Sequence, residues 1–269
     1  MLPVLDNEAM READRHTIED LGVPSLTLME NAATGVVEAL RDSYPKARRI
    51  LILCGRGNNG GDGLAAARLL ADRDLEVKVL LFADPQTLSP DAAENFGRAE
   101  SAGIPIVIVE GDDLSALDGE LESGPPDIVM DALLGTGIDR PLGGRLAEVA
   151  DRIDGTRSSV LAVDVPTGLS GSSPGVPGPV MAADLTVTFA ALKLCHVLPP
   201  ACLHCGEIAV AEIGIPEAVL ESSCSLRWIE AEDVTLLLPN RQTDSHKGGF
   251  GHLLLVAGAE GRGGAVAMA

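Results

Sequence analysis

A glycine-rich segment between two apolar stretches is the feature that most restricts the fold of this chain. Residues 55–63 read GRGNNGGDG, with five glycines in nine positions. The segment follows the short apolar run 50–53, and a helical pattern begins at Leu64. Glycines let backbone N–H groups approach a ligand closely, and a helix N-terminus favours an anion. A plain turn would need one such glycine, so we interpret the segment as a binding loop between a buried strand and a helix.

Apolar runs and helical patterns alternate along most of the chain. We expect strands at residues 50–53, 77–82, 104–109, 128–130, 160–163, 185–189 and 208–213, and a further one near the end of the chain at residues 253–256. We expect helices at residues 6–21, 24–41, 64–71, 91–102 and 144–153. Short continuous apolar runs suit strands that are buried on both faces. The alternation therefore predicts an α/β fold of three layers, with a doubly wound, mainly parallel sheet and helices on both faces. Right-handed crossovers would bring all the strand-to-helix loops to one edge of that sheet.

The charge of the chain disfavours two classes of partner. With 20 basic and 40 acidic residues, the formal net charge is −20, which repels nucleic-acid backbones and anionic lipid. We find no signal peptide, and no apolar run reaches the ~18 residues expected of a membrane span. The odd number of cysteines, five, suits a reducing compartment better than a disulfide framework. We therefore expect a cytoplasmic protein that binds neither nucleic acid nor membranes.

Two further glycine-containing loops carry an acidic residue at the end of a predicted strand. Asp131 and Asp164 each follow an apolar run directly. Ligands of open α/β sheets bind outside the carboxyl ends of the strands, where these loops would meet the glycine-rich one. A single Asp in such a place is often only a helix cap, but three acid-bearing loops at one edge favour a site. Lys193 lies just past another strand and is one of only four lysines, so it is either a solvated residue or part of this site.

A cluster of thiols and imidazoles stands near residue 200. It consists of Cys195, His196, Cys202, His204 and Cys205. The spacing from Cys202 to Cys205 resembles half of a zinc site. A structural zinc site needs four well-spaced ligands, and a second pair of this spacing is absent from the sequence. We therefore favour a chance cluster of buried thiols.

Taken together, these segments resemble the NAD(P)H-hydrate epimerase family, the YjeF N-terminal domain. The resemblance covers roughly residues 5–220, and several separate motifs occur in order. They are Leu28–Ala32 (LMENA), Gly57–Gly63 (GNNGGDG), Asp131 with Gly135–Gly137 (GTG), Asp164–Gly168 (DVPTG), Ala183–Phe189 (ADLTVTF) and Lys193. The resemblance implies a Rossmann-like fold. It also implies an isomerase that interconverts the R and S hydrates of NADH and NADPH, called NADHX and NADPHX, in the repair of damaged cofactors.

The resemblance also implies roles for individual residues. It implies one potassium ion per subunit of a homodimer, held by Asn59, Asp131 and Thr167. The family often has Ser at the last position, but Thr keeps the hydroxyl. Asp164 is our first candidate for the catalytic acid–base, together with Lys193. The implied substrate contacts are Asn58, Asn59, Gly60, Gly61, Asp62, Gly135, Thr136, Gly137, Ile138, Asp139, Arg140, Pro141 and Asp164.

The last part of the chain resembles a different domain. We expect the epimerase domain to cover residues 1–225 and the remainder to be a linker and the beginning of a second domain. Residues 246–252 (HKGGFGH) and 258–265 resemble the opening of the NAD(P)H-hydrate dehydratase domain, which has a ribokinase-like fold. The two activities are commonly fused in bacteria. The remainder of such a domain is missing here, so dehydratase activity is not expected from this chain.

Two other functions compete with this interpretation. Gly55, Gly57 and Gly60 match G-x-G-x-x-G, the fingerprint of nicotinamide-dependent dehydrogenases, and Asp84 could serve as the acid after the second strand. The paired asparagines and the continuation to Gly63 disfavour that function. The second alternative is a non-catalytic binding module of the same fold. Retention of the acidic residues and of Asn59 favours catalysis.

Overall fold

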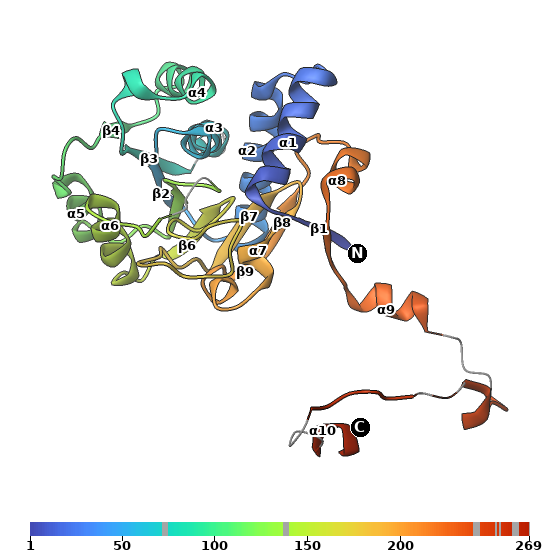
Figure 1. Cartoon of the computed structure of the whole chain (residues 1–269). Helices are drawn as coiled ribbons and strands as arrows, with labels where there is room; N and C mark the ends of the chain where they lie inside the picture. Colours follow the sequence, from blue (N-terminus) through green and yellow to red (C-terminus); the bar gives the residue numbers. More distant parts are fainter. Residues whose placement is uncertain are drawn as a thin grey trace. The chain divides into compact units, whose positions relative to one another are not determined.

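In the described part of the chain, seven parallel strands form the central sheet (Figure 1). The computed structural model describes residues 1–71, 75–136, 140–238, 243–250, 252, 254–259 and 264–268. The strands are β2 (Arg49–Cys54), β3 (Glu76–Leu81), β4 (Ile106–Ile108), β5 (Ile128–Ala132), β6 (Ser159–Val163), β7 (Leu185–Phe189) and β9 (Glu207–Ala211). Their spatial order is β4-β3-β2-β5-β6-β7-β9, and each neighbouring pair is parallel. The chain therefore winds outward in one direction from β2 and in the other from β5, which confirms the predicted doubly wound sheet.

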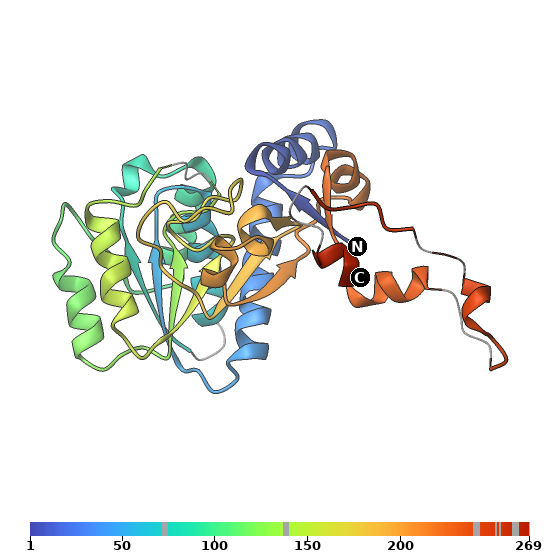
Figure 2. The same cartoon turned by 60° about the horizontal axis from the view of Figure 1, so that its bottom comes forward.

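Helices cover both faces of this sheet, as predicted (Figure 2). They are α2 (Ser25–Ser43), α3 (Asn58–Ala71) and α4 (Pro90–Ser101) on one face, and α5 (Ser115–Glu122) and α6 (Arg145–Asp154) on the other. Strand β2 shows why two faces are needed. Its Ile50 and Ile52 pack into the apolar cluster of α2 and α3, whereas Leu51 and Leu53 pack into that of α5 and α6. Successive side chains of a strand point to opposite faces, so a continuous apolar run buries both.

A second, smaller sheet ties the N-terminus to the strand that carries Lys193. Its order is β10 (Leu226–Trp228), β1 (Leu2–Leu5) and β8 (Leu192–Lys193). Leu5 is the register partner of Lys193, and α1 (Asn7–Arg15) begins directly after β1. Asp6 caps α1, because its carboxylate accepts hydrogen bonds from Glu8 N (3.0 Å) and Ala9 N (2.8 Å). The N-terminal segment is thereby held beside β8.

The remaining short elements of this region follow the main sheet. The helices are α7 (Leu194–Val197) and α8 (Glu217–Ser223), and α1 continues as a π-helical turn over His16–Asp20. The compact unit that contains both sheets spans Met1–Trp228. Because β10 pairs with β1, this unit extends past residue 225, where we expected the first domain to end.

The start of α3 differs from the sequence-based expectation. The helix begins at Asn58, inside the glycine-rich segment, whereas we expected a loop up to residue 63. A Cβ atom on Gly60 would lie 1.9 Å from the carbonyl oxygen of Gly55, and one on Gly55 would lie 1.9 Å from that of Leu133. Most of these glycines therefore let the helix start pack tightly against the ends of the strands. Gly57 has open space around it and lines a cavity.

The second unit, Ile229–Ala269, contains α9 (Ala231–Leu237), a 3-10 turn at Lys247–Phe250 and α10 (Gly264–Met268). Its large apolar side chains are exposed, including Leu236, Leu254 and Val256 at 84–87%. We expected a strand at residues 253–256, but residues 254–256 form no regular structure. No described strand lies alongside to pair with them. Within the described residues of the whole chain, no helix combines the length and apolar character needed to cross a bilayer.

Candidate active site

A cavity of about 500 Å³ opens at the carboxyl ends of the central strands. Its lining comes from the loop and helix start after β2, from the loop after β5, from Asp164 after β6, from Lys193, and from α1 and α2. Strands β2 and β5 are neighbours at the point where the winding direction reverses. Open α/β sheets bind ligands at such a switch point, outside the carboxyl ends of the strands. The three loops singled out in the sequence therefore converge on one cavity, as expected.

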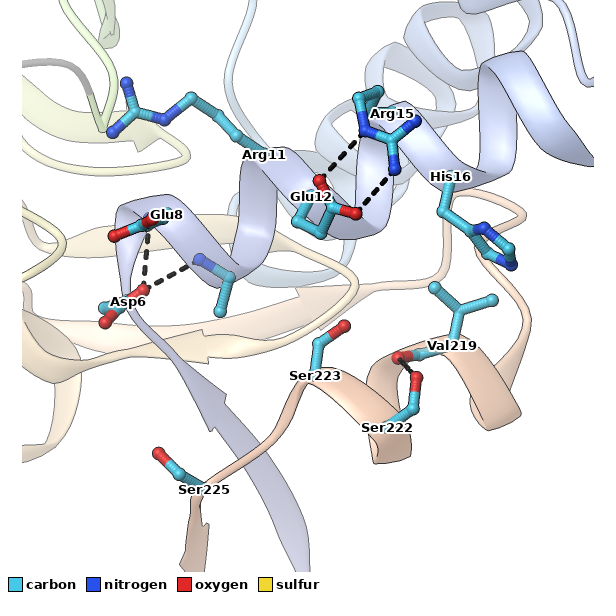
Figure 3. A pocket seen from close by; sticks show the side chains of 11 residues that line it. Asp6, Glu8, Arg11, Glu12, Arg15, His16, Val219, Ser222, Ser223 and Ser225 are labelled. Carbon is cyan, nitrogen blue, oxygen red and sulfur yellow. Dashed lines mark hydrogen bonds and ion pairs between the residues drawn. The ribbon is translucent and has the colours of Figure 1, made fainter.

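A larger hollow of about 820 Å³ lies between α1 and α8 (Figure 3). Its arginine side chains already have partners within the same segment of the chain. Arg15 contacts Glu12 at 2.6 Å and Glu19 at 3.1 Å, and Arg11 donates to the backbone oxygen of Asn7 at 2.9 Å. A ligand would have to compete with these local pairs. We therefore place the candidate active site in the smaller cavity.

Asp164 and Lys193 form a buried ion pair at the wall of this cavity. Lys193 Nζ donates to Asp164 Oδ1 at 2.7 Å, to Thr188 Oγ1 at 2.8 Å and to the Phe189 carbonyl at 3.0 Å. Only 1% of the Lys193 side chain is exposed, against 13% of the Asp164 side chain. The lysine is thus fully engaged below the surface, and the carboxylate is the member of the pair that a ligand can reach. The solvated alternative for Lys193 is wrong.

The backbone at Asp164 is held in an unusual conformation. Its φ angle is +65°, and Ala190, near the end of β7, has φ +60°. Positive φ is rare outside glycine, costs about 1–3 kcal/mol at most residues, and clusters at functional sites. The Asp164 N–H donates to Val187 O at 2.8 Å, which fixes this turn. Burial alone would raise the pKa of Asp164, but the Lys193 ammonium and the Thr188 hydroxyl hold it below its usual value. The carboxylate is therefore ready to accept a proton.

His196 supports the lysine from below. The backbone N–H of Lys193 donates to His196 Nδ1 at 3.1 Å, so the imidazole accepts at this nitrogen. Burial and the nearby Lys193 lower the pKa of His196 to about 4, which keeps the ring neutral. The neutral ring therefore carries its proton on Nε2, an atom without a hydrogen-bond partner among the described residues. We assign His196 to positioning the lysine backbone.

Asp131 and Thr167 form a second polar centre behind the cavity wall. Both are fully buried, at 0% exposure. The Asp131 carboxylate accepts from Thr167 Oγ1 at 2.7 Å, from Thr167 N at 2.8 Å and from Leu133 N at 3.2 Å. Burial nevertheless raises the pKa of Asp131 to about 6, although these hydrogen bonds oppose the rise. No cationic side chain pairs with Asp131 among the described residues, so a bound cation would fit this carboxylate.

The third residue expected at a cation site lies beside the same loop. Asn59 sits in the first turn of α3, and a Cβ atom on Gly135 would lie 3.3 Å from its side-chain oxygen. The buried amide nitrogen of Asn59 has no hydrogen-bond partner within the described ranges. A half-turn of the amide would place an oxygen at this unsatisfied position. The Leu134 N–H donates to Thr167 Oγ1 at 3.1 Å. The loop after β5 therefore contacts Asp131 through Leu133, Thr167 through Leu134 and Asn59 through Gly135. The oxygen-rich donor set suits a hard cation such as potassium.

The start of α3 faces the cavity with polar and acidic groups. Asn58, Asn59 and Asp62 line it, and Asn58 Oδ1 accepts from Ser89 Oγ at 2.7 Å. Asp62 is 8% exposed, and burial followed by repulsion from Asp164 raises its pKa well above the usual value. The free N–H groups of the helix start can hold a phosphate although the surface of the chain is acidic overall.

The predicted substrate contacts divide into four groups. Asn58, Asn59, Asp62, Gly135, Thr136 and Asp164 line the cavity, and Gly60 and Gly61 are buried behind it in α3. Arg140 and Pro141 are exposed and do not line the cavity; Pro141 lies beside Gly178, where an added Cβ atom would come within 3.1 Å of its side chain. Gly137, Ile138 and Asp139 lie outside the described residues. Among the described residues, the structure thus brings together the cores of the loops but leaves Arg140 and Pro141 outside the cavity.

The LMENA motif has a structural explanation. Asn31 Nδ2 donates to Ile213 O at 2.8 Å, which fastens α2 to the segment after β9. Glu30 pairs with Arg68 at 2.5 Å and joins α2 to α3. The sulfur of Met29 packs where a Cβ on Gly61 would clash, at 2.9 Å. These residues hold the helix that carries the glycine-rich start against its neighbour.

Several residues of the site were missed by the sequence reasoning. Asp14 lines the cavity from α1, and Thr188 bonds both Asp164 and Lys193. Asp14 stood in a helical pattern with nothing to mark it as functional, and Thr188 stood within an apolar strand.

Asp84, proposed for the dehydrogenase alternative, instead caps a 3-10 turn by accepting from Gln86 N at 2.9 Å. It does not line the cavity.

The cysteine cluster packs as part of a small apolar core. Cys195 and Cys205 are fully buried together with Val165 and Leu169. Cys205 Sγ donates to the backbone oxygen of Cys195 at 3.6 Å. Among the described residues, no group of three or more His, Cys, Asp or Glu side chains is arranged to hold a metal ion. Cys195 and Cys205 thus pack as buried thiols, whereas Cys202 and His204 are half-buried.

The chain matches one known protein family and several individual proteins. The family model described as YjeF-related protein N-terminus matches residues 25–195. A protein of Rhodopirellula baltica named NAD(P)H-hydrate epimerase is 40% identical over 219 residues, which cover 81% of this chain and 87% of that protein. Among solved structures, the yeast protein YNL200c matches with a TM-score of 0.69, at 19% identity, over 86% of this chain and 98% of the yeast chain. The structural match supports the fold alone.

Longer relatives also match most of this chain. The bifunctional NAD(P)H-hydrate repair enzyme of Thermofilum pendens is 40% identical over 246 residues, which cover 91% of this chain and 46% of that enzyme. The chain thus spans about half the length of such bifunctional relatives.

Proposed function

Because the chain belongs to the family of YjeF-related N-terminal domains, we propose that it interconverts the R and S hydrates of NADH and NADPH. This is the activity named for the epimerase relatives, and it is an isomerase reaction in cofactor repair. The observation that carries the proposal is the buried Asp164–Lys193 pair at the wall of the switch-point cavity. A carboxylate held ionised beside a ligand cavity can give and take a proton without a redox partner.

The substrate offers a carbon that bears a hydroxyl group beside a ring nitrogen. This carbon can lose its hydroxyl as water, leaving a planar cation, and regain water on the other face. The ring can also open and close again. Both routes need a group that exchanges a proton with the substrate, and Asp164 is our candidate. Such general acid–base assistance typically raises the reaction rate ~10²–10⁴-fold.

The glycine-rich helix start supplies the site for the phosphates. The N-terminus of α3 opens on the cavity with Asn58 and Asn59, and Arg56 also lines it. Backbone N–H groups and the helix dipole attract anions. We propose that the dinucleotide lies with its phosphates at α3 and its hydrated ring toward Asp164.

We also propose that Asn59, Asp131 and Thr167 hold one potassium ion. The ion would balance the buried charge of Asp131 and orient the loops after β2, β5 and β6. The oxygen-only donor set and the unpaired amide nitrogen of Asn59 support this assignment.

The ion proposal leads to an expected result for Asp131→Asn. The substitution keeps the size of the side chain but removes the charge that attracts the cation. We expect the epimerisation rate to fall ~10-fold or more and to lose its dependence on potassium concentration. The measurement is a potassium titration of the epimerisation rate of the wild-type and Asp131→Asn proteins. An Asp131→Asn protein that is still activated by potassium would reject the assignment. Asp118→Asn, on the surface helix α5, is a suitable control.

Two alternative functions are distinguished by one set of incubations. We would incubate the purified chain separately with mixed R and S hydrates and with NAD plus candidate alcohols. Epimerisation of the hydrates supports the proposal, whereas hydride transfer from an alcohol to NAD supports a dehydrogenase. Binding of the hydrate without either reaction supports a non-catalytic module. The local capping role of Asp84 already disfavours the dehydrogenase.

We propose that Ile229–Ala269 corresponds to a linker and the beginning of a dehydratase domain, as in the bifunctional relatives. Its exposed apolar side chains suit a segment whose core partners lie elsewhere. Deleting residues 229–269 is therefore expected to leave the epimerisation rate within about twofold and the thermal unfolding midpoint of the first unit unchanged. A large loss of either would show that this segment belongs to the first domain. We also propose a homodimer in the cytoplasm, on the family resemblance alone.

A further inference from the structure

The cavity contains a second acidic side chain that the proposed chemistry has not yet used. Asp14 lies on α1 and lines the cavity together with Asp164 and Lys193. It reaches the cavity from the N-terminal helix, whereas Asp164 and Lys193 reach it from the strand ends. Within the described residues, no backbone or side-chain group donates a hydrogen bond to its carboxyl group. An unpaired, half-buried carboxyl group stabilises nothing by itself, so its position in the cavity calls for a functional explanation.

The surroundings of Asp14 make its carboxyl group easier to protonate than that of an ordinary aspartate. Burial raises its pKa to about 6; Lys193 opposes this rise, and Asp164 adds to it. The other titratable groups around the cavity are Asp62, Asp91, Arg11 and Arg56, and the charge of Asp14 adds to the rise in the pKa of Asp62. Asp164, by contrast, is held ionised by its bond to Lys193. Two carboxyl groups in one cavity whose pKa values are shifted in opposite directions are the arrangement expected of an acid and a base.

We propose that Asp14 is the second acid–base residue of the inversion and that it serves one face of the substrate ring while Asp164 serves the other. This proposal rests on the proposed function and specifies its route. Asp14 gives its proton to the hydroxyl group as the carbon–oxygen bond breaks, and water leaves. The lone pair of the ring nitrogen forms the new bond to carbon, which gives a planar cation. Water then adds to the other face of the carbon while the Asp164 carboxylate takes its proton.

The balance of this route explains why both residues are needed. One proton has moved from Asp14 to Asp164, and no electron has been gained or lost. Inversion of the opposite epimer moves the proton back, and exchange with solvent resets either group. A single carboxylate could serve one face only. Asp62 is a weaker candidate, because it is 8% exposed within α3 and lies beneath the expected phosphate site.

The route requires Asp14 to be protonated while Asp164 is ionised. The rate should therefore fall as the pH rises through the pKa of Asp14, near 6, because the acid loses its proton. It should also fall at lower pH, where Asp164 takes up a proton. We expect a bell-shaped profile of kcat/KM, with the alkaline side assigned to Asp14.

The test compares Asp14→Asn with the wild-type chain. We expect turnover at saturating hydrate to fall ~10²-fold, with little change in hydrate binding, and the alkaline side of the profile to disappear. The unfolding midpoint should stay the same or rise, because an unpaired carboxyl group is removed. Glu12→Gln is the matched control on the same helix; its side chain pairs with Arg15 outside the cavity and should leave the rate unchanged (Figure 3).

A second variant keeps the test decisive if Asp14→Asn is poorly folded. In Asp14→Ala, added acetate should restore part of the turnover by replacing the missing carboxyl group. Near wild-type turnover in Asp14→Asn, an unchanged alkaline side, or no rescue of a folded Asp14→Ala would each overturn the proposal. A wild-type chain without any epimerisation would instead reject the proposed function itself.

Discussion

Replacing Lys193 with methionine is expected to lower the free energy of unfolding by about 3–5 kcal/mol and to abolish measurable epimerisation. The substitution leaves the Asp164 carboxylate buried without its cation, and removing one member of a buried ion pair typically has this cost. It also removes the donor to Thr188 and to the Phe189 carbonyl. Urea unfolding followed by circular dichroism, together with the epimerisation assay, measures both effects.

Two comparison variants separate the effect of breaking the buried ion pair from the effect of losing a lysine. Lys78→Met removes a lysine that pairs with Glu120 at the surface, where 36% of its side chain is exposed, and should cost less than about 1 kcal/mol. The double variant Lys193→Met/Asp164→Asn removes the stranded charge as well and should recover much of the lost stability, but no activity. If Lys193→Met were as stable as Lys78→Met, the buried pair would not have the importance assigned to it.

The second large effect is expected for Asp164→Asn. Asparagine tolerates the left-handed backbone that this position requires, since Asp164 has φ +65°, so the turn should survive. The substitution removes the proton-accepting carboxylate while keeping the size and much of the hydrogen bonding. We expect turnover to fall ~10²-fold or more, with substrate binding much less affected.

The alternative role for Asp164 is that of a capping residue, for which Asn would be almost equivalent. The two roles differ in the epimerisation rate at saturating hydrate, corrected for the folded fraction of each protein. A near wild-type rate would remove Asp164 from the acid–base role and bring Lys193 or Asp62 forward.

Much of the fold could be predicted from the sequence because its strands are buried on both faces. Each continuous apolar run, such as residues 50–53, is visible without any knowledge of its neighbours, and the structure confirms all the predicted strands of the central sheet. The family resemblance is also confirmed by the match to the family model. The strand expected at residues 253–256 is not formed at the described residues 254–256, because a strand needs a partner, which an apolar run alone does not supply.

The parts that escaped prediction depend on long-range contacts. The pairing of β1 with β8 joins residues 4 and 192, and nothing in the short segment Leu2–Leu5 indicates that partner. The early start of α3 depends on backbone approaches between Gly55, Gly60 and Leu133, which only glycine allows. In the sequence, five glycines indicated a loop, whereas in the structure most of them allow close packing.

The residues of the candidate site also divide into those that local sequence patterns predict and those that depend on long-range contacts. Asp131 and Asp164 were found because each ends an apolar run at a strand terminus, and parallel strands bring such ends together. Asp14 could not be found in this way, because its neighbours in space come from residues far along the chain. Its helical pattern alone gave it the same standing as the exposed Glu12 on the same helix.

The most direct test of the central claim follows one pure epimer of the hydrated cofactor in ¹⁸O-labelled water. The wild-type chain, with potassium present, should convert it to the mixture of R and S forms far faster than the protein-free solution does. Each inverted molecule should carry one labelled hydroxyl oxygen, because the hydroxyl leaves as water and returns from solvent. Equilibration at the protein-free rate would contradict the assignment of this cavity as an epimerase site.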